Sequence, residues 1–474
     1  MQSLSKTDFL NYLDNPKHFW VSKHAPDQLA PLDDFTRHQL EQGNEVQVIA
    51  KDYFRNYLFQ DEAKYDVKTE YSISNGPLVA RIDILVHDLV HDVYDVYEIK
   101  GSTNSKLKSE HKYDLAFQAH VIGDELSIRD YFLVRLNSEY EREGELIPAD
   151  LFVIDSMNDE VEKLGEETSD LINAALAVMS ETDMNNLEAC FKPSSCPCRD
   201  ICHPDLPEHP IYELSRLSKA KASLLRAQDK LKIAEILPDF ELTHRQTVQR
   251  KAVIAEVPII DKPALNEFLS DVEYPLYYLD YETLGLAIPA FDGYRPYQNM
   301  IFQYSLHVQE KKGGGVHHYE YLAIDREDPG LGLVKHLSEN IGSTGSMIVW
   351  NQGFEVGRNK EMAEMYPDYA DLLLGLNDRS FDLMKAFSKT IYIDPDFGGS
   401  ASLKKVLPVL LPGLGGKYSE MSVSNGAIAM LTWKELIWGD SSAQEADSLQ
   451  KALLSYCELD TLAMVEILKF LYAI

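Results

Sequence analysis

The chain has 474 residues, of which 45% are hydrophobic and 10% aromatic, so wholesale disorder is excluded and two large globular domains are expected. Asp and Glu number 76 against 45 Lys and Arg, which gives a net charge of −31. This acidity counts against a nucleic-acid ligand unless carboxylates are gathered in metal sites. The sequence has no run of about 20 apolar residues and no signal-peptide pattern at its start. We therefore expect a soluble, cytoplasmic protein that does not enter a membrane.

The N-terminal elements are predicted from a capping pattern and from alternation. Ser5 and Asp8 form a capping box, after which a helix is expected. Alternating apolar and polar residues predict strands over residues 79–85 and 93–100, and a polar hairpin loop joins them. A helix is predicted over residues 110–122.

Acidic and basic side chains gather on this predicted hairpin. Residues two apart on a strand share a face, so Glu98 and Lys100 project together, and Asp83 lies across from them on the preceding strand. Carboxylates can hold Mg²⁺ or Mn²⁺, which activates water, while an ammonium group orients the nucleophile. Glu45, in a helical stretch, could complete the metal shell. The alternative is a merely structural hairpin.

With DLAFQ at residues 114–118, this pattern resembles the PD-(D/E)XK nucleases, particularly the RecB-like branch that includes CRISPR adaptation nucleases. The resemblance implies an α/β domain of the restriction-endonuclease-like fold. It also implies metal ligands at Glu45, Asp83 and Glu98, a catalytic lysine at Lys100 and an active-site contact at Gln118.

Four of the five cysteines fall together, at Cys190, Cys196, Cys198 and Cys202. Such clustering suits a metal site in a reducing compartment, with zinc or an iron–sulfur cluster as the cofactor. RecB-like domains often carry a four-iron cluster whose first ligand comes from an N-terminal Cys-Pro element, and the similar stretch here has Asn15. Three alternatives stay open: Cys198 replaces that ligand, zinc is bound instead, or the site is lost.

A basic segment follows prolines 204, 207 and 210, which mark a boundary because proline is disfavoured within helices and central strands. Residues 214–232 have a helical pattern with regularly spaced basic residues. Arg216, Lys219 and Arg226 are candidate contacts to a phosphate backbone, and the alternative is a solvated helix face.

The C-terminal region begins near Tyr274. A buried strand is predicted over residues 276–279, further strands over 300–308 and 346–350, and a closing helix over 443–471. Asp280 and Glu282 share one face at the end of the first strand, and Tyr456 and Asp460 share one face of the helix. With Glu355, four carboxylates from three distant elements could hold two metal ions of the Mg²⁺ or Mn²⁺ type.

This order of residues resembles the DEDD exonucleases, in the subclass whose last motif is Tyr-x-x-x-Asp. The resemblance implies an RNase H-like domain of the DnaQ type, with Tyr456 positioning the attacking water. Glu355 departs from the aspartate usual in the second motif. Asn351 and Asp382 are candidate substrate contacts.

Stretches along the whole chain also resemble a bacterial family that joins a RecB-like region to an RNase H-like exonuclease domain; they are residues 4–10, 296–298, 402–408 and 456–461. We predict a nuclease domain over residues 1–203, a helical connector over 204–270 and an exonuclease domain over 271–474. The expected function is metal-dependent hydrolysis of DNA, or of RNA, in repair, recombination or defence. The alternative is a nucleic-acid-binding or scaffolding protein with one or both sites inactive.

Overall fold

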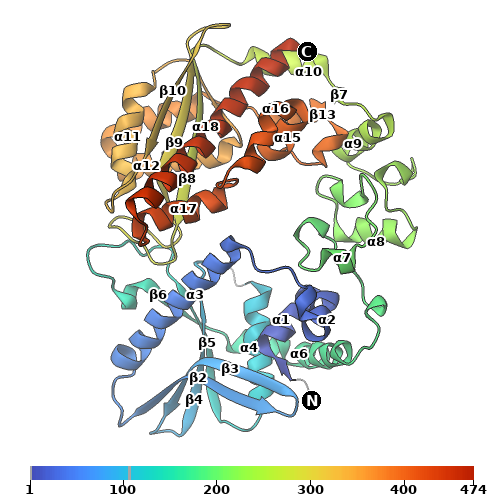
Figure 1. Ribbon diagram of the computed structural model, residues 1–474. Coiled ribbons are helices and arrows are strands. Elements are labelled where there is room, and N and C mark those ends of the chain that lie inside the picture. Colours follow the sequence, from blue (N-terminus) through green and yellow to red (C-terminus); the bar gives the residue numbers. More distant parts are fainter. Residues whose placement is uncertain (1–2, 105–107) are drawn as a thin grey trace. The chain divides into compact units, whose positions relative to one another are not determined.

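A computed structural model describes residues 3–104 and 108–474, and it divides the chain into two compact units (Figure 1). Unit 1 contains Met1–Pro204 and Gly285–Gln298, and unit 2 contains Asp205–Leu284 and Asn299–Ile474. Both units combine helices with a mixed sheet, so the expected α/β class is confirmed. Among the described residues, no helix is both long and apolar enough to cross a membrane.

Unit 1 is built on a six-stranded sheet in the order β1-β3-β4-β5-β6, with β2 also paired to β3. Neighbours are antiparallel except for the parallel pairs β1–β3 and β4–β5. The predicted hairpin is β3 and β4, close to its expected bounds. The strands are β1 (Leu4–Ser5), β2 (Tyr65–Asn75), β3 (Leu78–Asp88), β4 (Val93–Lys100), β5 (Ile128–Leu136) and β6 (Phe152–Ser156).

Two apolar cores stabilise unit 1, one on each face of its sheet. One core joins α1, α2, α4 and α6 to the sheet through side chains such as Phe9 and Phe117, and the other joins α3 through Val46 and Ala50. The Ser5 capping box begins α1, as predicted. The helices are α1 (Lys6–Asp14), α2 (Pro16–His24), α3 (Asp34–Tyr53), α4 (Ser109–Ile122), α5 (Pro148–Leu151), α6 (Asn158–Met179) and α7 (Arg199–Cys202).

Unit 2 has a five-stranded sheet in the order β10-β9-β8-β11-β12 and a separate pair, β7 and β13. Strands β8, β11 and β12 are parallel, whereas β9 and β10 form an antiparallel hairpin. The predicted C-terminal strands are therefore present. The strands are β7 (Ile259–Ile260), β8 (Leu276–Gly285), β9 (Asn299–Gln309), β10 (Val316–Leu322), β11 (Ser346–Val349), β12 (Ser380–Asp382) and β13 (Tyr392–Ile393).

Helices α11, α12 and α13 share an apolar core with this sheet, and the long α18 packs against β9 (Figure 1). The remaining helices include α15 and α17, which pack on α18. The helices are α9 (His244–Ala255), α10 (Lys262–Ser270), α11 (Pro329–Asn340), α12 (Gln352–Met365), α13 (Ala370–Asp378), α14 (Lys385–Ser388), α15 (Leu403–Leu410), α16 (Pro412–Gly415), α17 (Gly426–Trp438) and α18 (Ala443–Ala473).

The helix expected over residues 214–232 is shorter in the structure, where α8 covers only Lys219–Ala227. Arg216 has a left-handed backbone with φ 53°, which interrupts a helix, and Ser218 caps the new one by accepting from Lys221 N–H. Leu214 therefore enters a small apolar core from outside the helix.

Candidate active sites and metal centre

Asp83 and Glu98 meet where β3 and β4 part. The antiparallel pairing runs up to Ile84 and Tyr97, and beyond it the Asp83 carboxylate accepts a hydrogen bond from the Ile99 backbone N–H at 2.9 Å. A side chain thus replaces a strand carbonyl as the partner of that N–H. This exchange holds Asp83 beside the face of β4 that carries Glu98.

The Glu98 carboxylate is the centre of a buried polar cluster. Lys6 Nζ donates to both of its oxygens at 2.8 and 2.9 Å, and Lys100 Nζ donates to Oε1 at 2.7 Å. Gln118 Nε2 donates to Oε2 at 2.7 Å. Sequence reasoning placed Glu98, Lys100 and Gln118 in one site, and the structure brings these three together.

Asp114 is a further member of this cluster. The sequence analysis named it only as part of the stretch over residues 114–118 and gave it no role. It lies one turn before Gln118 on α4, accepts from Gln118 Nε2 at 2.9 Å and from Lys100 Nζ at 2.5 Å, and is 3.4 Å from Lys6 Nζ. The spacing of four residues could have identified it, because residues i and i+4 share a helix face. Lys6 was missed as well, and it comes from the turn that the Ser5 cap begins.

Burial and neighbouring charges set the protonation of this cluster. Burial and, next, the Glu98 carboxylate raise the pKa of Asp83, Lys6 opposes the rise, and the net pKa is about 7. Burial also favours the neutral form of Glu98, but Lys100 and Lys6 outweigh it and hold the Glu98 pKa below its usual range. Glu98 is therefore a carboxylate that two lysines already neutralise.

The oxygen donors of this cluster suit a hard divalent cation only in part. Gln118 Oε1 is buried without a hydrogen-bond partner and could serve as a ligand with Asp83. Before Glu98 could bind a cation, its carboxylate would have to release Lys6. Glu45 is exposed on α3, and among the described residues no hydrogen bond or ion pair joins it to Glu98.

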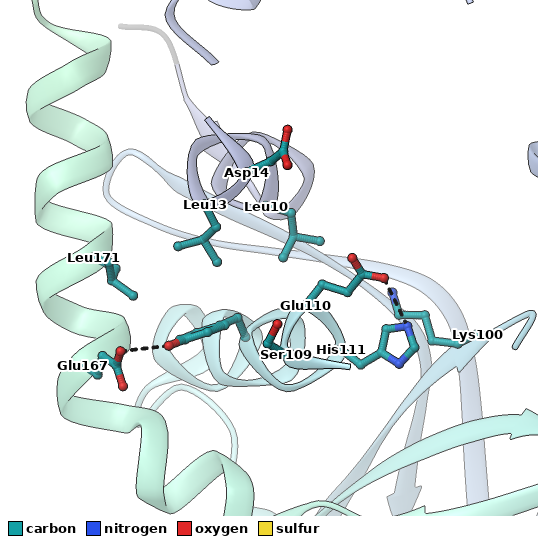
Figure 2. Close-up of a pocket in the computed structure, with 10 residues that line it drawn as sticks. Leu10, Leu13, Asp14, Lys100, Ser109, Glu110, His111, Glu167 and Leu171 are labelled. Atoms are coloured by element: carbon teal, nitrogen blue, oxygen red, sulfur yellow. Dashed lines mark hydrogen bonds and ion pairs between the residues drawn. The ribbon is translucent and has the colours of Figure 1, made fainter. Parts of the chain in front are cut away.

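A cavity of about 540 Å³ opens beside Lys100. It is lined by α1, α4 and α6, with Leu10, Leu13 and Leu171 on its apolar side and Glu110 and His111 near Lys100 (Figure 2). Lys100 is the member of the Glu98 cluster that lines this cavity.

The four predicted cofactor-binding cysteines come together in unit 1, and all are free thiols. Cys198 Sγ and Cys202 Sγ are 3.6 Å apart, and each of the other two contacts a histidine: Cys196 Sγ is 3.2 Å from His18 Nε2, and Cys190 Sγ is 3.3 Å from His203 Nε2. Asn15 makes no substitute ligand, because its side chain caps α2. Sequence reasoning missed both histidines.

In unit 2, Asp280 and Glu282 lie on β8 and face Asp460 of α18. Glu282 and Asp460 are each 7% exposed, and the neighbouring Cys457 thiol contacts the Asp280 carboxylate, with Sγ 3.7 Å from Oδ2. Unit 2 therefore brings together three of the four predicted carboxylate ligands from one strand and one helix.

Lys404 and Tyr418 also belong to this site, and neither was assigned from the sequence. Lys404 Nζ donates to Tyr456 Oη at 2.8 Å and lies over the Tyr456 ring, 4.8 Å from its centroid. Tyr418 donates a hydrogen bond to Asp460. Lys404 lies in the stretch over residues 402–408, which entered the sequence analysis only through its family resemblance. Nothing in the residue types of that stretch indicated an active site.

Glu355 approaches the site from α12. Its side chain is 2% exposed, and its Oε2 is buried without a hydrogen-bond partner. Asn351 begins α12 with a left-handed backbone, and its N–H donates to Asp382 Oδ1 at 3.2 Å. Asp382 thus fixes the start of the helix that carries Glu355, and Asn351 itself is exposed.

The carboxylates of unit 2 are held close in a buried environment with one lysine. Burial and, next, the Asp280 carboxylate raise the pKa of Glu355 to about 9. Burial and then Asp460 raise the pKa of Asp280, and burial raises that of Asp460. Burial lowers the pKa of Lys404, an effect the nearby carboxylates oppose. Three buried carboxylates and the half-buried Asp280, with this deficit of positive charge, fit Mg²⁺ or Mn²⁺.

The three basic residues predicted to contact phosphates lie near the two ends of α8. Arg216 and Lys219 are exposed, and Arg226 is half-buried. Lys219 and Arg226 are seven residues apart, which places them on one side of the helix.

Part of the chain is similar to a known protein family. Residues 277–402 match the family described as "Domain of unknown function (DUF2779)". This match contains Asp280, Glu282, Glu355 and Asp382, and it ends before Asp460.

Two curated proteins are similar to part of the chain. One is "Uncharacterized protein UU173" of Ureaplasma parvum, 25% identical over 211 residues, which are 41% of this chain and 31% of that protein. Another is "Uncharacterized protein MG366" of Mycoplasma genitalium, 24% identical over 210 residues, with the same shares of the two chains. The match thus spans less than a third of the length of these relatives.

Proposed function

We propose that this protein is a metal-dependent nuclease that hydrolyses phosphodiester bonds in DNA, with RNA as the alternative substrate, and that unit 2 is an RNase H-like exonuclease. The observation that carries the proposal is the convergence of Asp280, Glu282 and Asp460 beside Tyr456. Excess buried negative charge of this kind favours divalent cations, and Mg²⁺ or Mn²⁺ would there activate water and neutralise charge on the phosphate. The resemblance to DEDD exonucleases supports the same reading.

The side chains of unit 2 have separable tasks in such a reaction. Asp280, Glu282, Glu355 and Asp460 would hold the cations. Tyr456, fixed by Lys404 through the 2.8 Å hydrogen bond, would position the attacking water. Lys404 would offset negative charge until cations and substrate arrive, and Tyr418 would orient the Asp460 carboxylate through its hydrogen bond.

For unit 1 we propose a second nuclease site of the PD-(D/E)XK type, within a RecB-like domain over residues 1–203 that is followed by the connector over residues 204–270. The proximity of Asp83, Glu98 and Lys100 and the cavity beside Lys100 support this second proposal. The pairing of Glu98 with two lysines favours the alternative in which this site binds nucleic acid without cleaving it. The proposed pathway, in DNA repair, recombination or defence, rests on resemblance alone.

Degradation of end-labelled DNA and RNA, single- and double-stranded, tests the proposal with Mg²⁺ or Mn²⁺ present. We expect Asp280→Asn to abolish cleavage by unit 2. Asp271→Asn is the matched control, because Asp271 and Glu273 repeat the Asp-x-Glu spacing and Asp271 is exposed at the end of α10. Equal activity in wild type and Asp280→Asn would remove the assignment of unit 2.

Unit 1 needs its own variant. Asp83→Asn alters a ligand and keeps the hydrogen-bonding shape, and Glu62→Gln is its control because Glu62 lies in an exposed Glu-x-Lys sequence. Activity that survives in Asp280→Asn and disappears when Asp83→Asn is added would assign cleavage to unit 1. Nucleic-acid binding without cleavage by folded, metal-supplied wild type would favour the binding or scaffolding alternative.

A further inference from the structure

Three cysteines and one histidine of unit 1 point to a single centre. His18, Cys196, Cys198 and Cys202 each offer one ligand atom, and these four atoms lie within 4.8 Å of one another. Cys198 and Cys202 are 3.6 Å apart at sulfur, and His18 Nε2 is 3.2 Å from Cys196 Sγ. Sulfurs bound to one tetrahedral zinc at about 2.3 Å stand roughly 3.8 Å apart, so this group needs little movement to enclose the ion.

We propose that His18, Cys196, Cys198 and Cys202 bind one structural zinc ion, in which His18 is the ligand contributed by the N-terminal helices. Three thiolates and one imidazole make a closed tetrahedral set that zinc commonly takes. The remaining pair, Cys190 and His203, contact each other at 3.3 Å and form a second, adjoining group with Cys196.

The residues around His18 orient its imidazole ring so that Nε2 points toward Cys196 Sγ. Asn15 caps α2 by accepting from the backbone N–H groups of Lys17 and His18, both at 3.0 Å, which places His18 in the first turn. With Nε2 on Cys196, the other ring nitrogen, Nδ1, faces the Asp14 carboxylate at 4.0 Å. Ligating histidines usually direct their second nitrogen at a carboxylate or carbonyl. Asn15 therefore positions the ligand that stands three residues after it.

The arrangement favours zinc over an iron–sulfur cluster. A cluster binds its cysteines on different iron atoms and so spreads its ligands around a multi-atom core. Here the ligand atoms converge on one point, and one of them is an imidazole nitrogen. Cys198 Sγ and Cys202 Sγ are 3.6 Å apart, a spacing that suits two ligands of one ion.

Zinc at this position would join α2 to the segment over residues 196–202, which is far from it in sequence. Apolar contacts already connect the two regions, because Val21 packs with the buried cysteines. A metal that binds only the folded form adds its binding free energy to stability. This role is independent of phosphodiester cleavage in either unit.

The test is metal analysis of the full-length protein purified under anaerobic conditions. We expect one zinc per chain, little iron and no visible iron–sulfur absorbance. His18→Ala and Cys198→Ser should lose the zinc, and His18→Cys should retain it. Cys190→Ser and His203→Ala should keep it, as should His24→Ala, which alters a histidine at the other end of α2.

Cobalt spectra keep the outcome interpretable if a variant is poorly folded. Co²⁺ added to metal-stripped wild type should give the tetrahedral absorption of a mixed sulfur–nitrogen site, and His18→Cys should shift it toward an all-sulfur spectrum. Zinc that survives in His18→Ala but is lost in Cys190→Ser would overturn the proposal in favour of four cysteines. Stoichiometric iron with cluster absorbance, or neither metal in wild type, would overturn it as well.

Discussion

Lys404 Nζ donates a 2.8 Å hydrogen bond to Tyr456 Oη and joins the residue proposed to position water to the group of buried carboxylates. The two residues are 52 apart in sequence and come from α15 and α18. The same ammonium group is attracted by Asp460, Glu282 and Asp280, in that order of strength. One lysine thus orients the tyrosine and partly balances the carboxylates.

Removing this lysine should impair cleavage by unit 2. We expect Lys404→Met to lower kcat about 10- to 100-fold, because positioned groups of this kind contribute at least that much to a reaction. Lys405→Met is the matched control, since Lys405 is the exposed neighbour on the same helix. Cleavage rates of labelled DNA at saturating Mn²⁺ measure the effect. Equal rates in the two variants would show that Lys404 has no part in the reaction.

Glu355 should make the metal-free protein less stable as pH rises. Its pKa is raised in the folded state from 4.5 to about 9, mainly by burial, so between these values the folded form binds more protons than the unfolded form. Stability due to this group is therefore complete below about pH 4.5 and falls as pH rises toward 9. Glu355→Gln should flatten this dependence.

Thermal unfolding in a chelator across that pH range is the measurement. Glu364→Gln is a suitable control, because Glu364 is an exposed carboxylate on the same helix. Added Mg²⁺ or Mn²⁺ should raise the Tm of wild type at pH 8 more than that of Glu355→Gln, since a bound cation needs the ionised carboxylate. Identical pH profiles in wild type and Glu355→Gln would contradict the assignment.

Glu98 should be important for the stability of unit 1, whatever its catalytic role. It accepts hydrogen bonds from Lys6, Lys100 and Gln118, so Glu98→Ala leaves two largely buried ammonium groups with one fewer counter-charge. Breaking such a buried pair costs about 3–5 kcal/mol. Urea unfolding should show a loss of this size, whereas Glu62→Ala on the surface should cost less than about 0.5 kcal/mol. A loss below 1 kcal/mol in Glu98→Ala would mean that water replaces the carboxylate.

The elements were predictable where local patterns determine them. The Ser5 capping box begins α1, alternation marks β3 and β4, and α18 follows from a long periodic pattern. The helix expected over residues 214–232 was too long, because the left-handed backbone of Arg216 has no mark in composition. Local periodicity is thus a good guide to element type and a poor one to breaks.

Within the candidate sites, only the residues that belong to recognisable sequence motifs were predictable. Lys6 is 92 residues from Glu98, and His18 is 178 residues from Cys196, so each contact depends on tertiary packing. Asn15 was read as a missing ligand, yet it is the cap that positions His18. Lys404 and Lys405 are adjacent in sequence. Only the orientation of α15 shows which of the two lysines faces the site.

The basic segment offers a separate prediction about binding. If Lys219 and Arg226 contact phosphates, neutralising both releases about two fewer counterions, and the slope of log affinity against log salt should become shallower by roughly 1.4–1.8. The double variant Lys219→Gln/Arg226→Gln tests this in an Asp280→Asn background, where cleavage does not consume the ligand. Lys335→Gln/Lys360→Gln makes the same change in net charge at exposed positions on α11 and α12. Slopes that change equally in both double variants would indicate a general charge effect, and the side of α8 that carries Lys219 and Arg226 would then be a solvated face.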